Sequence, residues 1–441
     1  MTTDYRVTQD DELLVTADLD VAVVPAARPT ALEPTTLTSS VGQPAAPGET
    51  IDGSSAGPGS ESDSSKVTLL RQLLRPCGYF LFSRVTVLFA ALSLKWLYPH
   101  RHVLNTLATG WDGSPYTTIA RSGYPHGITH ANGYLWAYFP SWPAAIRATA
   151  TLTRLSIPDA ALLASFIFGL ASAVAVWLAV REVFGPRVAD RSVLLYVFFP
   201  LSFVLSMAYT EGLFIAASAF CLFALSRRYW ITASLFAALA SLTRNFGFVL
   251  IACVAVAAIP AIWKERKVRP LVALAISPLG AMAWLLYCWW RAGTPLAFVK
   301  AETFWANAHF VFFLAPIASL ARLTTGLHAF TKGADVLTGC AMVFIFLGLA
   351  VLWRTRHEGV RLPLAWWVFT VGSVLGAMSP YWTMSTLRYS MVIIPFFAAF
   401  AWKLRPSWMG PLVGMMATMQ GALAVIVFIG AAHPHGSGIF P

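Results

Sequence analysis

Long apolar segments recur from residue 79 to residue 430, and this recurrence most constrains how the chain folds. Apolar residues make up 57% of the sequence and charged residues only 12%, with a mean hydropathy of +0.65. A membrane-spanning helix needs about 17–25 mostly apolar residues. The sequence therefore predicts an all-α, polytopic membrane protein of about eleven transmembrane helices. The expected spans are 79–98, 159–180, 192–208, 211–226, 230–243, 247–263, 271–290, 334–353, 362–379, 389–403 and 408–430.

The first 65 residues have a different composition from the rest of the chain. They hold eleven Asp/Glu against two Arg and are rich in Pro, Ser, Thr, Gly and Ala. Such a segment buries too little apolar surface to offset its chain entropy. We predict that residues 1–65 form a disordered acidic tail and that residues 66–441 form the membrane domain. Because the N-terminus shows no signal-peptide pattern, the tail is expected to stay in the cytoplasm.

Two segments do not match a single span. Residues 134–154 are rich in aromatic residues and contain two prolines, so an interfacial or re-entrant piece within a large first extracytoplasmic loop is expected. Residues 308–326 are similarly ambiguous.

The basic residues predict the orientation of the spans, because cytoplasmic loops are enriched in Lys and Arg. With the N-terminus inside, the eleven spans place fourteen Lys/Arg in five inner connections. These connections are 181–191, 227–228, 264–269, 354–361 and 403–405. The sequence thus predicts a multi-pass protein of the cell membrane.

The same orientation brings the polar residues that interrupt the other helix ends to the outer face. These residues are Asp112, Glu211, Arg244, Glu302 and Arg388. Ionisable residues at membrane depth are costly and mark functional sites by default. An active site on the extracytoplasmic face is therefore expected, with Asp112 in the first outer loop as a candidate catalytic base.

Each of these residues also has a purely structural interpretation. Asp112 would then be a solvated loop acid, and Glu211 would stabilise the start of a helix beside Thr210. Arg244 would favour a helix C-terminus, and Arg388 would anchor at the interface. The first-loop histidines and the five cysteines lack the spacing of a metal site, so no metal is predicted.

Six short strings carry a resemblance to a known family. They are Trp111-Asp112-Gly113 with Tyr116 and Gly123-Tyr124-Pro125; Tyr138-Phe139-Pro140-Ser141-Trp142-Pro143; Phe199-Pro200 through Tyr209-Thr210-Glu211; Leu242-Thr243-Arg244-Asn245; Trp289 through Phe298; and Leu387-Arg388-Tyr389. In their order and spacing, over residues 79 to 405, the chain resembles GT-C type mannosyltransferases that depend on a polyprenyl phosphate. Within them it is similar to bacterial relatives of the PIG-V mannosyltransferase of GPI-anchor synthesis.

The resemblance implies a GT-C-like fold and an enzyme, a hexosyltransferase that moves a mannosyl unit from a polyprenyl-phosphate sugar to an acceptor hydroxyl by an inverting mechanism. Asp112 would remove the proton, Arg244 and Arg388 would stabilise the leaving phosphate, and Glu211 would orient the sugar or acceptor. Substrate binding would also involve Trp111, Tyr116, Tyr209 and Tyr389. The expected partners are the lipid-linked donor, the bilayer and a glycan, lipid or protein acceptor, without nucleic acid.

The main alternative from another class is a transporter or flippase of a polar or lipid-linked substrate. Transporters often show internal repeats and broken helices near the bilayer midplane. The sequence contains no convincing repeat, and its candidate charges gather at one face. No certain cofactor follows from the residues, and the need for a divalent cation stays open.

Overall fold

The computed structural model describes residues 60–100, 102–304, 317, 333–379 and 385–432, and every regular element among them is a helix. The predicted all-α fold is confirmed for this part of the chain. Residues 1–59 of the predicted disordered tail lie outside the described residues. The last residues of that tail belong to the first helix, which begins at Ser60. Residues 308–326 also lie outside the described residues, apart from 317.

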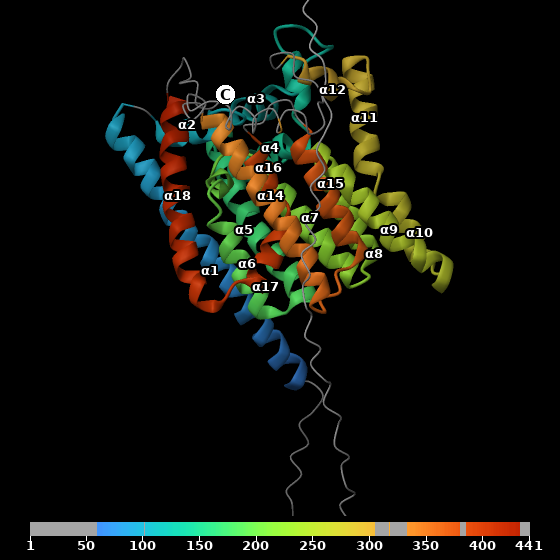
Figure 1. The fold of residues 1–441 in the computed structure, drawn as a ribbon. Coiled ribbons are helices and arrows are strands. Elements are labelled where there is room, and N and C mark those ends of the chain that lie inside the picture. Colours follow the sequence, from blue (N-terminus) through green and yellow to red (C-terminus); the bar gives the residue numbers. More distant parts are fainter. Residues whose placement is uncertain (1–59, 101, 305–316, 318–332, 380–384, 433–441) are drawn as a thin grey trace, which may run out of the picture. The chain divides into compact units, whose positions relative to one another are not determined.

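The first half of the chain forms two long helices and several shorter elements (Figure 1). In order these elements are α1 (Ser60–Leu97), α2 (Val103–Thr109), α3 (Gly113–Ser122), η1 (Gly133–Ala137), α4 (Ser141–Thr153), α5 (Ile157–Phe184), α6 (Pro186–Val197), η2 (Ser202–Ser206) and α7 (Glu211–Ser226). The ambiguous segment 134–154 is divided between η1 and α4, which have 5 and 13 residues. Neither is long enough to cross a bilayer.

The second half continues with helices of mixed length. They are α8 (Trp230–Ser241), η3 (Asn245–Gly247), α9 (Phe248–Glu265), α10 (Val268–Ile276), α11 (Leu279–Ala292), α12 (Ala297–Glu302), α14 (Gly333–His357), α15 (Leu364–Met378), α16 (Thr386–Ser390), α17 (Ile394–Lys403) and α18 (Pro406–Ala432).

Within the described ranges, six helical segments are long and apolar enough to cross a membrane. They are Arg71–Leu97, Ile157–Phe184, Asn245–Lys264, Val268–Ala292, Asp335–His357 and Pro406–Ala431, joined by the shorter apolar helices Glu211–Ser226, Trp230–Ser241 and Leu364–Met378. Large apolar side chains such as Phe82 and Phe89 are 68% and 67% exposed on α1, which suits contact with lipid. The chain is a multi-pass membrane protein, and the count of eleven spans stays a prediction.

The segment expected to span at 192–208 is broken in the structure. Helix α6 ends at Val197 and η2 begins only at Ser202, because Pro200 lacks an N–H and restricts the residue before it. The carbonyl oxygens released by this break find side-chain donors from other helices. Arg84 of α1 donates to the carbonyl oxygens of Val197 and Ser202 at 3.3 and 3.1 Å, and Gln420 of α18 donates to that of Val197 at 3.0 Å.

The segment expected at 389–403 is broken as well. Helix α16 ends at Ser390, and α17 begins at Ile394 with Pro395 in its first turn, where proline is tolerated. Arg388 therefore lies on a short helix of its own instead of opening a long one.

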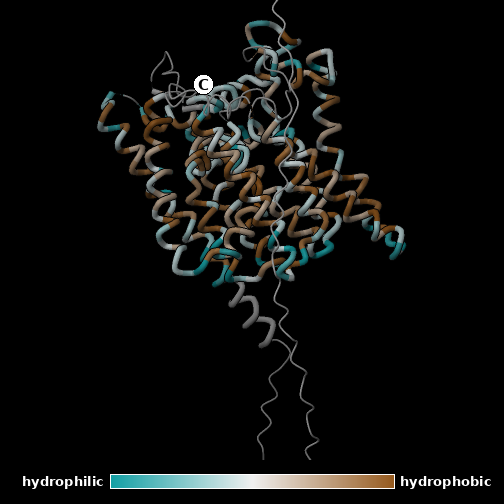
Figure 2. Tube along the Cα trace, in the orientation of Figure 1, coloured by the Kyte–Doolittle hydropathy of each residue, from teal (hydrophilic) through white to brown (hydrophobic). Residues whose placement is uncertain are grey.

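Four of the five basic connections meet at one end of the bundle. Arg227 pairs with Glu182 at 3.1 Å, Arg191 donates to the Leu404 carbonyl at 3.4 Å, and Lys403 pairs with Glu358. In Figure 2 this end of the bundle is the lower edge. Hydrophilic residues lie along it, below helices coloured mainly as hydrophobic. Since α7 runs 16 residues from Glu211 to its end beside Arg227, Glu211 lies about 24 Å away along the helix axis.

Candidate active site

A tight turn between α2 and α3 presents Asp112. Trp111 has a φ of 54°, a left-handed conformation that is unusual for a bulky residue. At Gly113 a Cβ atom would lie 2.4 Å from the carbonyl oxygen of Ala108, so only glycine fits the close approach of α2 and α3. The sequence Gly110-Trp111-Asp112-Gly113 thus folds into a fixed turn that places the carboxylate at the N-terminus of α3.

The carboxylate of Asp112 is held by residues from two distant segments. Arg388 Nη1 lies 2.6 Å from Oδ2, and the Tyr138 hydroxyl donates to Oδ1 at 3.3 Å. The Asp112 side chain remains 32% exposed. Burial and then the negative charge of Asp112 raise the pKa of Tyr138 well above its usual value, so this phenol stays protonated and can donate. Asp112 is therefore an oriented, reachable carboxylate.

A second carboxylate lies beneath this pair. Glu211 is the first residue of α7 and its side chain is 1% exposed. Its Oε1 accepts from Arg244 Nη1 at 2.7 Å and lies 3.5 Å from Arg388 Nε. Arg388 thus joins Asp112 and Glu211, and Glu211 in turn joins the two arginines. We call Asp112, Glu211, Arg244 and Arg388 the charged cluster.

Aromatic rings enclose the two guanidinium groups. Arg388 lies over Tyr209 and Tyr389, with its Cζ 4.9 and 5.3 Å from the ring centroids. Arg244 lies over Tyr389 as well, at 4.9 Å. Rings of this kind attract a cation and hold its planar head in one orientation. Tyr389 therefore contacts both guanidinium groups.

The structure brings together most of the residues that the sequence predicts for the site. The contacts above link six of these residues, namely Asp112, Tyr209, Glu211, Arg244, Arg388 and Tyr389. In addition, the Asp112 backbone N–H donates a hydrogen bond to the Tyr209 side chain. Tyr116 packs edge-on against Tyr138, with ring centroids 4.8 Å apart. The Trp111 indole instead points towards α18, where it donates to the Val427 carbonyl at 3.4 Å.

Two contacts of the cluster were not assigned to the site from the sequence. Tyr138 donates to Asp112, and the Ser385 hydroxyl accepts from Arg388 Nη2 at 3.2 Å. Tyr138 belongs to one of the six strings of the family resemblance, and that membership was the available signal. Ser385 carries no such signal.

Glu302 adds a carboxyl group near Asp112. It ends α12, which packs on η1, while Phe298 of α12 contacts Phe139 at 5.4 Å between ring centroids. Burial and then the charge of Asp112 raise the pKa of Glu302 to about 7. Within the described residues, no three His, Cys, Asp or Glu side chains converge as a metal-binding group would require.

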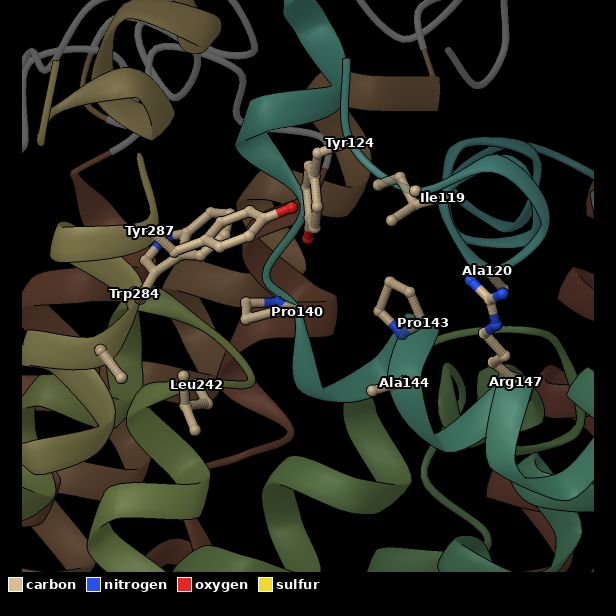
Figure 3. A pocket seen from close by; sticks show the side chains of 12 residues that line it. Ile119, Ala120, Tyr124, Pro140, Pro143, Ala144, Arg147, Leu242, Trp284 and Tyr287 are labelled. Carbon is tan, nitrogen blue, oxygen red and sulfur yellow. The ribbon is translucent and has the colours of Figure 1, made fainter. Parts of the chain in front are cut away.

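The structure also contains an apolar groove of about 370 Å³. Its walls come from α3 and the two residues after it, from Pro140 and the first turns of α4, from Leu242 directly after α8, and from α11 (Figure 3). Leu242 of this groove lies two residues before Arg244, and Pro140 lies two residues after Tyr138. In Figure 3 the ring of Tyr124 stands opposite Trp284 and Tyr287, and Arg147 lies at the other side. The lining residues are Ile119, Ala120, Gly123, Tyr124, Pro140, Pro143, Ala144, Arg147, Leu242, Ala283, Trp284 and Tyr287.

Solved structures of an archaeal oligosaccharyltransferase from Archaeoglobus fulgidus are similar to this chain. The enzyme tethered with an acceptor peptide is 14% identical with a TM-score of 0.43, covering 80% of this chain and 55% of that one. The enzyme AglB in complex with an inhibitory peptide and a dolichol-phosphate is 13% identical with a TM-score of 0.38, covering 81% and 56%. The chain thus spans about half the length of these proteins.

Sequence comparison gives one family. No curated protein matches the chain, whereas residues 140–292 match the family described as dolichyl-phosphate-mannose-protein mannosyltransferase. This stretch runs from α4 to the end of α11 and contains Glu211 and Arg244, but neither Asp112 nor Arg388. The relation to PIG-V stays a prediction. Over residues 140–292, about a third of its length, the chain is thus similar to the dolichyl-phosphate-mannose-protein mannosyltransferase family.

Proposed function

We propose that this protein transfers a mannosyl unit from polyprenyl-phosphate mannose to an acceptor hydroxyl with inversion at the anomeric carbon. The observation that carries the proposal is the charged cluster. It combines an oriented carboxylate with two guanidinium groups at one end of the membrane domain. A single displacement needs these two elements, a base for the attacking hydroxyl and cations for the leaving phosphate.

Asp112 serves as the general base in this proposal. Its 32% exposure leaves carboxylate lone pairs open to an acceptor hydroxyl, while Arg388 and Tyr138 fix its orientation. The acceptor oxygen forms a bond to the anomeric carbon as the bond from that carbon to the phosphate oxygen breaks. The hydroxyl proton moves to Asp112, and the electron pair of the broken bond stays on the phosphate.

Arg244 and Arg388 stabilise the leaving phosphate. Their guanidinium groups are stacked on Tyr389 and joined through Glu211, so they are already oriented before the reaction begins. Charges fixed in advance are worth more than charges that must reorient as the reaction proceeds. Tyr116 and Tyr209 are proposed to shape the surrounding surface for the sugar.

The apolar groove supports a lipid-linked donor. It is lined mainly by aliphatic and aromatic side chains, among them Leu242, which lies two residues before Arg244 in the sequence. Such a lining suits the polyprenyl chain of a donor whose phosphate we place at the arginines. Because the donor brings its activated phosphate on a lipid, a nucleotide site is not required.

We also propose that this site faces the extracytoplasmic side. The basic connections lie at the opposite end of α7 from Glu211, and basic loops favour the cytoplasm. A cysteine introduced at the exposed Ser114 should react with a membrane-impermeant thiol reagent in intact cells. A cysteine at Glu358 should react only after the membrane is opened, and the reverse pattern would contradict the orientation.

The central test uses membranes that carry the protein and polyprenyl-phosphate mannose with a labelled sugar. Wild type should transfer the label to an acceptor, and Asp112→Asn should reduce transfer by about 10²–10⁴-fold, the usual contribution of a general base. Glu358→Gln is the matched control, since Glu358 pairs with Lys403 at the far end. Full transfer by a correctly inserted Asp112→Asn variant would rule out this base. Movement of the labelled lipid across the bilayer without a new glycosidic bond would favour the flippase alternative.

A further inference from the structure

Glu211 has a contact pattern that neither helix capping nor substrate binding explains. It is buried at 1% exposure, and a single oxygen, Oε1, meets both Arg244 and Arg388. Its other oxygen, Oε2, is buried and has no hydrogen-bond partner among the residues that the structure describes. The neighbouring Thr210 makes no capping hydrogen bond through its side chain.

The charges of the cluster balance before any substrate binds. Asp112 and Glu211 supply two negative charges, and Arg244 and Arg388 supply two positive ones. Without Glu211 the cluster would carry one net positive charge. Glu211 lies at the N-terminus of α7, a helix of 16 residues, and the helix dipole favours a negative charge at that end.

The proposed reaction makes this balance important, because its product is more negative than its donor. A phosphodiester carries one negative charge, whereas a phosphate monoester carries about −1.5 to −2 near neutral pH. Arginines that stabilise the growing charge also attract the finished product. A site with an unbalanced pair of arginines would therefore release polyprenyl phosphate slowly.

We infer that Glu211 is the built-in counter-anion of the phosphate site, which holds Arg244 and Arg388 together and limits how tightly they retain the product phosphate. This inference rests on the proposed function. Glu211 is then a positioning residue that acts through both arginines. Because Oε2 has no donor from the described residues, part of its negative charge stays uncompensated and opposes a bound anion.

The test compares Glu211→Gln, which keeps the size and removes the charge, with wild type. The dissociation constant of polyprenyl phosphate is measured directly with purified protein in detergent, without turnover. We expect Glu211→Gln to bind this phosphate about tenfold more tightly, because a unit of opposing charge near the ligand is removed. A role restricted to holding the arginines in place predicts the opposite, since looser arginines bind phosphate more weakly.

Turnover gives a second readout. In Glu211→Gln a first round of mannosyl transfer should be followed by a slower steady state, because product release limits the rate. Glu211→Asp retains the charge and should bring the dissociation constant back towards the wild-type value, and Glu358→Gln should leave it unchanged. If Glu211→Gln does not fold, the affinity of Glu211→Asp for polyprenyl phosphate is compared with that of wild type. An affinity of Glu211→Asp that equals or exceeds that of wild type supports the inference. A lower affinity of Glu211→Asp opposes it.

The outcomes separate this inference from the proposed function. Tighter phosphate binding by Glu211→Gln in a protein that transfers no mannose would retain the counter-anion and overturn the transferase. Equal or weaker binding by Glu211→Gln in an active transferase would overturn the counter-anion alone. Polyprenyl phosphate that binds to neither protein would overturn both the inference and the phosphate site.

Discussion

Arg84 and Arg388 both lie within the apolar part of the chain, but their partners differ in kind. Arg84, inside the span Arg71–Leu97, donates to the Ser202 carbonyl at 3.1 Å and the Ser206 hydroxyl at 3.0 Å, both neutral. Arg388 meets the carboxylates of Asp112 and Glu211 at 2.6 and 3.5 Å. The first arginine satisfies a broken helix, whereas the second belongs to a set of balanced charges.

We propose that this difference distinguishes a structural arginine from a functional one in a membrane. An ionisable residue at membrane depth is a functional candidate by default. Backbone carbonyls are fixed by the fold and cannot yield to a ligand, so Arg84 is committed to them. A guanidinium paired with a carboxylate can exchange part of that contact for a phosphate, which leaves Arg388 available for chemistry.

The largest expected effect that sharpens this comparison comes from Arg388→Lys. Lysine keeps the charge but loses the planar fork that meets Asp112, Glu211 and Ser385 together. We expect kcat/KM for mannosyl transfer to fall about a hundredfold, as for the loss of one charge-stabilising donor. Steady-state transfer assays measure this, with thermal unfolding in detergent expected to remain close to wild type. Unchanged transfer would remove Arg388 from the site.

Arg84→Met should have the opposite profile. Methionine retains an unbranched apolar side chain but leaves the carbonyl oxygens of Val197 and Ser202 without the arginine donor. We expect a loss of about 2 kcal/mol in the free energy of unfolding, since buried polar groups without partners are costly. Reversible unfolding in detergent measures it.

The matched observation is the turnover number of the Arg84→Met protein that remains folded. It should equal that of wild type, because Arg84 contacts no member of the charged cluster in the structure. A stable Arg84→Met protein with greatly reduced turnover would break the distinction between the two arginines.

The long helices were the predictable part of the fold. Hydropathy alone predicted a span at 159–180, and the structure has Ile157–Phe184, because a long apolar run in lipid must satisfy its backbone within a helix. The interruptions before η2 and α17 were not predicted, although Pro200 and Pro395 were visible. Hydropathy averages over a window and does not register the single missing N–H that breaks a helix.

The charged cluster was predictable as a set but not as an arrangement. Counting the spans placed Asp112 and Arg388 at the same end of the bundle, and the structure adds their contact across 276 residues. One oxygen of Glu211 contacts both Arg244 and Arg388, and this contact depends on the tertiary packing of their side chains. Sequence spacing carries no information about such a contact.

Glu302 offers a smaller test, because burial and then the negative charge of Asp112 raise the pKa of its carboxyl group. With a pKa of about 7 it is neutral in mild acid and ionised in mild alkali. As the pH rises through 7, a second negative charge appears near Asp112 and opposes the anionic donor. We expect the KM for the donor to rise about threefold over this range.

Glu302→Gln should remove this rise, because glutamine stays neutral at every pH. Three other ionisable side chains belong to the same region as Glu302. They are Lys300 on α12, Arg291 on α11 and His130, whose ring centroid lies 6.0 Å from that of Phe304. His130→Gln is therefore the control, and it should keep the wild-type dependence on pH. A rise in KM that persists in Glu302→Gln and disappears in His130→Gln would transfer the titration to the histidine. In that case Glu302 of α12 would contribute no charge near neutral pH. The two arginines would then balance the negative charges of Asp112 and Glu211.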